Sequence, residues 1–596
     1  MKLPIVRNTS RPTSHVPRPT FHVPRLTFLC LGMVILLSAC SWVSPTVIMP
    51  TESPPTTQLD DTPTPFPTKT DVPIPTVTPT VTPVEERPEE RPTKEDSSSI
   101  ESMPEENVAI DSMDSMDSMD SNIAMSPMFD LAWEDRTPFE AGLIESEQAI
   151  LDELLVEATI YHIKLTVSPE LDHLSGEQAL LFTNRETQPL DDIQFRLFPN
   201  IMGGTTEVTE VYLNDESVEP TYSHENSAMN ILLPEPLLSG EQVVLSMNFE
   251  VEIPTSLESN YGALAFAEEV LAAAHVYPMI PVYDDEGWNV EVAPSYGDVV
   301  YADANFYIVQ ISAPAKLVLA TSGVEIDQQI NDEIQTRTYA VGPARDFYFV
   351  GSEKYVVISE TVGDVTINSY AFPEQEEGSK QLLVYTTDAM ESFIARFGPY
   401  PYVELDMIST PTLALGIEYP GITVNTQQMY DIDAEMYGRT GRVFLESTVT
   451  HEVAHQWFYN IIGSDQLDEP WVDEALTQYA TWLYYVDAYG EENAEGFFGS
   501  FEGRWDRVEQ ADIPIGLPVA KYEGAEYGAV IYGRGPIFVR ELSEEMGTAL
   551  FEEFLRDYYQ THKWRIASTE SFKTLAESHC DCDLTPMFEA AVYPKE

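Results

Sequence analysis

Two kinds of hydrophobic spacing divide the chain. Between about residues 150 and 365, apolar and polar residues alternate in short runs. The run "VLSMNFEVEI" places apolar side chains at every second position from Leu245 to Ile253, and "YHIKLTV" repeats the pattern from Tyr161. Such alternation is typical of strands with one buried face, and turns rich in Gly, Pro, Asn and Asp separate the runs. We therefore predict an antiparallel β-sandwich over residues 150–365.

From about residue 373 the spacing becomes helical. The stretch "KQLLVYTTDAMESFIARFG" has the apolar spacing of a helix, strands follow between Val403 and Val424, and most of the remaining chain has a helical pattern. The expected fold class is therefore α+β and multidomain, with the sandwich followed by a second domain over residues 373–596.

A histidine pair stands inside one helical stretch, "TVTHEVAHQWFYN". His451 and His455 are four residues apart, so a helix projects both from one face. The apolar residues around them, with Gly463 as the helix end, predict a buried helix that runs on to this glycine. The pattern H-E-x-x-H on a helix is typical of zinc peptidases, in which the glutamate, here Glu452, acts as general base.

A third ligand can be found downstream, and it is needed because a catalytic zinc ion usually has three protein ligands and one open position. In "LDEPWVDEALTQY", Asp468 and Pro470 predict the start of a second helix. Glu474 lies one turn into that helix, with eighteen residues between it and His455. We predict one Zn²⁺ per chain, bound by His451, His455 and Glu474.

With "WVDEALTQY" following "HEVAHQWFYN", the chain resembles the aminopeptidase N family of gluzincin zinc peptidases, the membrane alanyl aminopeptidases and their relatives. The resemblance covers about residues 150–596. It implies a sandwich packed on a thermolysin-like (gluzincin) catalytic domain, and removal of N-terminal residues from peptides with a free N-terminus. Larger relatives add a C-terminal helical-repeat domain, which we do not expect in this chain.

One further motif concerns the substrate's α-amine. The sequence "LGIEY" at 415–419 stands where the family carries G-x-M-E-N, whose glutamate binds that amine, so the resemblance implies that Glu418 binds substrate. The family's first Gly and its Asn are Leu and Tyr here. A second amine-binding residue from the sandwich would fall near residues 271–274, which offer no side-chain acceptor, with Glu268 or Glu269 as possible substitutes.

Another motif, "YGRGPIFVREL", resembles the family's Y-x-K-G-A, whose tyrosine stabilises the transition state. It implies that Tyr532 is catalytic, with Tyr522 and Tyr527 as nearby alternatives. Because the amine motif is altered, two other functions stay open: a gluzincin hydrolase with endopeptidase or other specificity, and an inactive surface binding protein on a peptidase scaffold.

The N-terminus is typical of a targeting signal. A basic segment precedes twelve apolar residues at 26–37, which are too few to span a bilayer and suit a signal peptide. They end in "LSAC", which resembles the lipobox of bacterial lipoproteins and implies a lipid on Cys40. We predict a lipoprotein signal over residues 1–39, or alternatively an ordinary secretory signal. The lipid would anchor an extracytoplasmic protein to the membrane.

Residues 40–129 have the composition of a disordered tether. A Pro/Thr-rich part is followed by an acidic part with the repeat "DSMDSMDSMD", and neither part can bury a core.

The charge balance bears on partners. The chain has 99 Asp and Glu against 31 Lys and Arg, a net charge of −68, which argues against nucleic acid as a partner and against a polybasic hold on lipid. Cys580 and Cys582 lack further nearby ligands for a second metal, so unpaired or locally paired thiols are favoured. The oligomeric state stays open.

Overall fold

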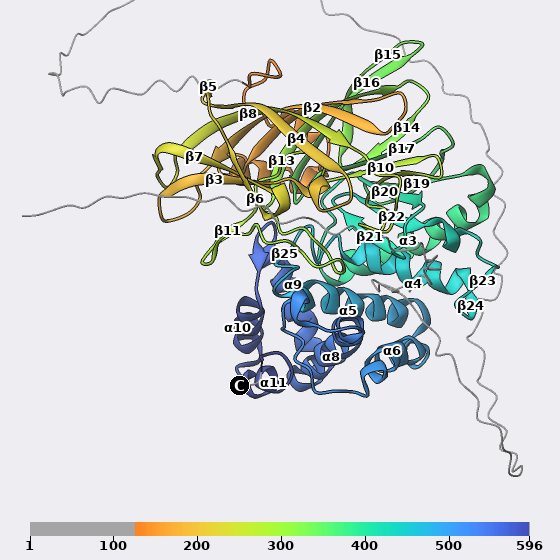
Figure 1. Ribbon diagram of the computed structural model, residues 1–596. Coiled ribbons are helices and arrows are strands. Elements are labelled where there is room, and N and C mark those ends of the chain that lie inside the picture. Colours follow the sequence, from red (N-terminus) through yellow and green to blue (C-terminus); the bar gives the residue numbers. More distant parts are fainter. Residues whose placement is uncertain (1–125, 595–596) are drawn as a thin grey trace, which may run out of the picture. The chain divides into compact units, whose positions relative to one another are not determined.

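The computed structural model describes residues 126–594, and the N-terminal part is a β domain (Figure 1, orange to green). Its largest sheet has eight strands in the order β15 (Val324–Ile330), β16 (Ile334–Ala344), β13 (Asn305–Pro314), β1 (Ile160–Val167), β2 (His173–Thr183), β8 (Gln242–Glu252), β4 (Thr205–Leu213) and β5 (Glu216–Ser217). Two smaller sheets run β14 (Val318–Thr321), β17 (Tyr348–Ser352), β10 (Val270–Ala274), β9 (Leu264–Ala267), and β3 (Leu190–Arg196), β7 (Ala228–Leu237), β6 (Thr221–Ser223).

The predicted alternation is confirmed along β8. Its buried side chains include Leu245, Met247, Phe249 and Val251, and the residues between them are partly or fully exposed. Pairing in this sheet is antiparallel with one exception, because β1 and β13 are parallel. Alternation marks the buried face of a strand but carries no information about the direction of its neighbour.

The second domain begins with a five-stranded sheet in the order β18 (Val356–Val362), β19 (Val365–Ala371), β20 (Glu404–Thr410), β22 (Ile422–Thr426) and β21 (Gly416–Tyr419). Helix α3 (Glu376–Arg396) connects β19 to the parallel strand β20, as a parallel crossover requires. The hairpin β18–β19 lies before residue 373, yet by pairing it belongs to this sheet and not to the sandwich. Period-2 spacing identified both strands but could not identify the sheet that they join.

Helices make up most of the remaining chain (Figure 1, teal to blue). The longer ones are α4 (Gly441–Ala454), α5 (Pro470–Tyr489), α6 (Glu491–Trp505), α8 (Gly535–Met546), α9 (Thr548–His562), α10 (Thr569–Cys580) and α11 (Thr585–Ala591). The short elements are α1 (Thr137–Glu140), α2 (Leu151–Leu154), α7 (Glu526–Ala529), β11 (Tyr283–Asp284), β12 (Gly287–Trp288), β23 (Glu435–Met436), β24 (Arg439–Thr440), β25 (Gly463–Ser464) and β26 (Ile566–Ala567). Over residues 126–594 no helix combines the length and the apolar character that a membrane crossing needs.

The histidine helix is shorter than predicted. Helix α4 ends at Ala454, and Gly463 begins β25 instead of capping the helix. Arg345, a buried arginine between β16 and β17, contacts the segment after the helix: its guanidinium donates to the carbonyl oxygens of Asn460 (2.9 Å), Ile461 (3.2 Å) and Arg565 (2.8 Å). These bonds tie the turn that follows α4 to the β domain.

Packing also begins slightly earlier than the predicted end of the tether at residue 129. The hydroxyl of Ser126 lies 2.6 Å from Nδ1 of buried His162, and the ring of Phe129 meets the same imidazole edge-on at 5.3 Å. These contacts join residues 126–129 to β1. The signal over 1–39, Cys40 and the tether up to residue 125 lie outside the described residues.

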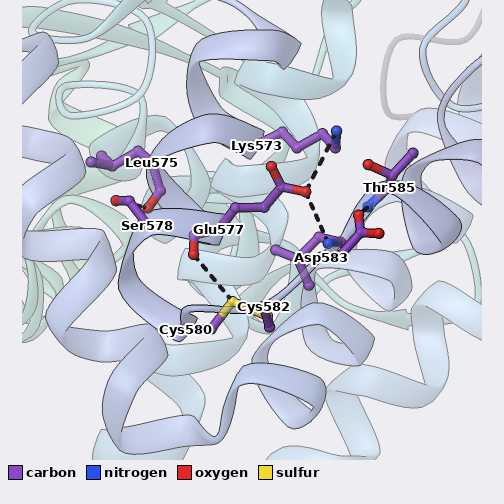
Figure 2. The surroundings of a disulfide bond; sticks show 9 residues. Lys573, Leu575, Glu577, Ser578, Cys580, Cys582, Asp583 and Thr585 are labelled. Carbon is purple, nitrogen blue, oxygen red and sulfur yellow. Dashed lines mark hydrogen bonds and ion pairs between the residues drawn. A yellow bond between two sulfur atoms is a disulfide. The ribbon is translucent and has the colours of Figure 1, made fainter.

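The two cysteines, left open between free and locally paired thiols, form a disulfide across a single residue at the end of α10 (Figure 2). Asp581 between them adopts a left-handed conformation with φ 49°. Glu577 accepts a hydrogen bond from the main-chain N–H of Leu584 at 2.9 Å and lies 3.5 Å from Nζ of Lys573. Disulfide and carboxylate together fix the turn that leads from α10 into α11.

Candidate active site

Three predicted ligands come together between α4 and α5. His451 lies in the last turn of α4, His455 is the residue that ends it, and Glu474 lies one turn into α5. Nε2 of His451 and Nε2 of His455 are 3.1 Å apart, and they lie 3.2 and 3.5 Å from Oε2 of Glu474. Tetrahedral zinc with ligands at about 2.0–2.1 Å places its ligand atoms about 3.3 Å apart, so the cluster has the dimensions of a zinc site.

The chemistry of the donors agrees with that geometry. Oε2 of Glu474 is buried without a satisfactory hydrogen bond, which is costly unless a cation fills the place of the donor. Burial lowers the pKa of His451 to about 4, so its imidazole is neutral, as a ligand must be. Burial opposes ionisation of Glu474, but the two histidines hold its pKa below the usual range. His451, His455 and Glu474 are the zinc site of this chain.

A residue that sequence analysis had not singled out orients His455. Asp473 lies 2.8 Å from Nδ1 of His455, and the carbonyl oxygen of Phe458 lies 3.0 Å from the same atom. With the Nδ1 proton donated to these acceptors, Nε2 keeps its lone pair for the metal. The only indication of this role in the sequence is that an aspartate stands directly before Glu474.

Glu452 lies next to the three zinc ligands but is not one of them. Its side chain covers Gly416 of β21 so closely that a Cβ there would stand 2.3 Å from Oε1 and 2.6 Å from Cγ of Glu452. Only glycine leaves room for this placement. Burial raises the pKa of Glu452 to about 8, and a divalent cation at the adjacent ligands would lower it again.

Of the three tyrosines considered, Tyr532 contacts the ligands. It lies in a π-helical turn, Val530–Arg534, and its hydroxyl donates to Oε1 of Glu474. Tyr522 instead donates to the carbonyl oxygens of Pro514 and Ile515, both at 3.0 Å. The ring of Tyr527 packs edge-to-face against that of Tyr532, with the ring centroids 5.8 Å apart.

Glu418, on the edge strand β21, completes the predicted set. One of its carboxylate oxygens, one of Glu452 and a ring nitrogen of His455 lie within 4.8 Å of one another. The side chain is 7% exposed, and Oε1 accepts a bond of 3.4 Å from the amide of Gln466. Burial raises the pKa of Glu418 well above its usual range, a shift that a nearby positive charge would reverse.

A second carboxylate, Asp298, was missed by sequence analysis. It comes from the loop before β13, and one of its oxygens lies within 4.8 Å of oxygens of Glu418 and Asp473. Tyr296 anchors this loop, because its hydroxyl donates to the carbonyl oxygen of Tyr522 at 2.8 Å. Burial and the charge of Glu418 raise the pKa of Asp298 well above its usual range.

The residues considered as substitutes lie elsewhere. Glu268 and Glu269 are exposed, and the Glu269 carboxylate pairs with Lys354. Residues 271–274, one leucine and three alanines, are buried in β10 and contribute only apolar side chains.

Comparison with known proteins agrees with this site. Residues 383–590 match the model of the Peptidase family M1 domain. The human "Endoplasmic reticulum aminopeptidase 1" is 21% identical over 386 residues, which are 62% of this chain and 40% of that protein. "Aminopeptidase 2" of Candida albicans is 22% identical over 455 residues, 74% of this chain and 47% of that protein. The chain thus spans less than half the length of these curated relatives.

Solved structures show the same architecture. The crystal structure of an M1 zinc metallopeptidase from Deinococcus radiodurans is similar with a TM-score of 0.53 at 21% identity, covering 74% of this chain and 95% of that one. A mutant M1 zinc metallopeptidase from the same organism, bound to a Tyr-Ser-Ala substrate, has a TM-score of 0.52 at 20% identity. The fold is therefore that of a two-domain M1 metallopeptidase, an N-terminal β-sheet domain followed by a catalytic α+β domain. His451, His455 and Glu474 all lie within residues 383–590, the part of the chain that matches the Peptidase family M1 domain.

Proposed function

We propose that the chain is a zinc-dependent aminopeptidase that hydrolyses N-terminal residues from peptides with a free N-terminus. The observation that carries the proposal is the pair of carboxylates, Glu418 and Asp298, next to the zinc ligands. No lysine or arginine pairs with either of them within residues 126–594. Closely spaced, partly desolvated carboxylates repel each other, so a cationic group of the substrate would stabilise both.

The remaining residues supply the hydrolytic chemistry. When bound, zinc lowers the pKa of a ligated water to about 7 and polarises a carbonyl group. Glu452 accepts the proton of the attacking water and delivers it to the nitrogen of the leaving amine. The hydroxyl of Tyr532, already directed at the ligands, donates to the oxyanion that develops on the scissile carbonyl.

The position of Glu418 would determine which bond is cut. Because Glu418 lies beside both Glu452 and His455, an ammonium held there leaves room for little more than one residue before the scissile carbonyl. A peptide bound in this way presents its first peptide bond. The complete set of ligands argues against the inactive binding protein, since such a scaffold has no need of a base or a metal.

The experiment that tests the proposal compares free and N-acetylated peptides of the same sequence. The wild type should cleave the free peptides and leave the acetylated ones nearly untouched. Glu418→Ala should lower kcat/KM for free peptides by about 100-fold or more, as expected when a buried ammonium loses a charged partner. Asp298→Asn should give a smaller loss in the same direction, because it removes charge while keeping shape.

Glu269→Ala is the matched control for Asp298→Asn, since it removes an exposed carboxylate from the same β domain. Efficient cleavage of acetylated peptides by the wild type would favour the endopeptidase alternative and leave the zinc hydrolase standing.

We further propose that lipid on Cys40 anchors the enzyme outside the cytoplasm. The support is in the sequence alone: a basic segment, the apolar run at 26–37 and the lipobox-like "LSAC". Cys40→Ser should abolish acylation and membrane partitioning but leave peptide hydrolysis unchanged, because the zinc ligands and Glu418, Glu452 and Tyr532 lie far from it in sequence, between residues 418 and 532. Fractionation of cells followed by a salt wash measures the first effect. A variant that still sediments with membranes after the wash would refute the anchor.

A further inference from the structure

We propose that Arg504 is a positioning residue for Tyr532, holding the main chain of that tyrosine so that its hydroxyl reaches the zinc ligands. The inference rests on the proposed role of Tyr532 in hydrolysis. It assigns a function to α6, a helix that contributes no side chain to the zinc ligands themselves.

One guanidinium nitrogen makes the two contacts that matter. Nη1 of Arg504 donates to the carbonyl oxygen of Tyr532 at 3.0 Å and to Oε1 of Gln478 at 3.1 Å. The amide nitrogen of Gln478 lies 3.1 Å from Nδ1 of His451. Arg504 thus connects the peptide unit of Tyr532 with a side chain that touches a zinc ligand, and the second acceptor keeps the guanidinium from swinging away.

The backbone at Tyr532 needs such support. It forms a π-helical turn, Val530–Arg534, which is rare and frequent at functional sites because its wider hydrogen bonding re-aims one side chain. An ordinary α-helical turn here would rotate Tyr532 relative to α8. A donor from a neighbouring helix therefore helps to select this conformation.

Two glycines show how closely the turn is held. A Cβ on Gly533 would lie 2.9 Å from the carbonyl oxygen of Phe501 and 2.9 Å from the main-chain nitrogen of Trp505, both on α6. A Cβ on Gly535 would lie 2.6 Å from Cβ of Ala475, the neighbour of Glu474. The turn is wedged between α5 and α6, so a shift of either helix would move Tyr532.

The test uses Arg504→Met, which keeps an apolar stem of similar length and removes the donors. It should lower kcat for free-amine peptides by about 10- to 100-fold, as a misplacement on the order of 1 Å does, with KM changed by less than about twofold. Zinc content should stay at one per chain. Arg504→Lys, which keeps a donor, should recover part of the loss.

The control is Arg540→Met on α8. Arg540 packs against Phe498 and Trp482 and pairs with Glu495 and Glu544, away from the zinc ligands, so this variant should keep the wild-type kcat.

A double-mutant cycle separates positioning from a merely structural role. In a Tyr532→Phe background, Arg504→Met should lower kcat by less than about twofold, because the hydroxyl that Arg504 positions is already gone. An equal loss in both backgrounds, or an unchanged kcat in the single Arg504→Met variant, would overturn the inference. An active wild type with an equally active Tyr532→Phe variant would instead remove Tyr532 from the mechanism, a failure of the proposed function.

Discussion

Glu452→Gln should lower kcat for free-amine peptides by about 10³-fold while zinc stays bound. The expected fall in kcat follows from the loss of general acid–base catalysis, which contributes about 10²- to 10⁴-fold in enzymes. Zinc should stay because the ion is held by His451, His455 and Glu474, and Glu452 is outside that group. Glutamine has the shape of glutamate, so the close packing over Gly416 is kept. Initial rates and metal content of the same preparation measure both effects.

Gly416→Ala provides an independent check of the base. A Cβ at residue 416 would overlap the side chain of Glu452, so the carboxylate must move although its chemistry is unchanged. A clear loss of kcat with retained zinc is therefore expected here too. Near-wild-type turnover in Glu452→Gln would show that another group takes the proton from water, and the mechanism would have to be abandoned.

The chain shows which parts of a fold can be predicted from spacing. The buried face of β8 followed directly from alternation, because side-chain direction in a strand is a local property. The parallel pairing of β1 with β13 and the assignment of β18–β19 to the catalytic sheet depend on distant segments. The turn after α4 is held by Arg345, more than one hundred residues away in sequence, a contact that local spacing cannot reveal.

Some residues of the site could likewise be predicted from the sequence, and others could not. His451 and His455 could be predicted because a helix projects residues four apart from one face, and Glu474 because it follows His455 at the spacing of the family motif. Asp298 could not, since "PSYGDVV" has no periodicity, and its loop is held at the site by distant contacts such as the bond from Tyr296 to a main chain 226 residues away. Gly416 stood at a variable position of its motif, and only the packing of Glu452 shows why no side chain fits there.

Glu474→Ala should weaken zinc binding by more than about 100-fold. Loss of a residue that only orients a ligand costs up to about 100-fold in metal affinity, and loss of the ligand itself should cost more. The variant removes one of three ligands together with the charge that balances the ion, and leaves two imidazoles 3.1 Å apart. Hydrolysis at low zinc should fall with occupancy. Because the hydroxyl of Tyr532 also loses its acceptor on Glu474, activity should stay low even when excess zinc refills the site.

Metal affinity can be measured without activity, by competition with a chelator and by thermal unfolding. A ligand that binds only the folded state stabilises it by RT ln(1 + [L]/Kd), so zinc should raise the Tm of the apo wild type and leave that of Glu474→Ala nearly unchanged at the same concentration. Asp473→Ala is the graded control. It keeps all three ligands and removes the acceptor that orients His455, so its affinity should fall by about 10- to 100-fold and its Tm should still respond to zinc. Wild-type affinity in Glu474→Ala would exclude Glu474 as a ligand, and the three-ligand geometry would then need another carboxylate, such as Glu418 or Glu452, which lie within 4.8 Å of a ring nitrogen of His455.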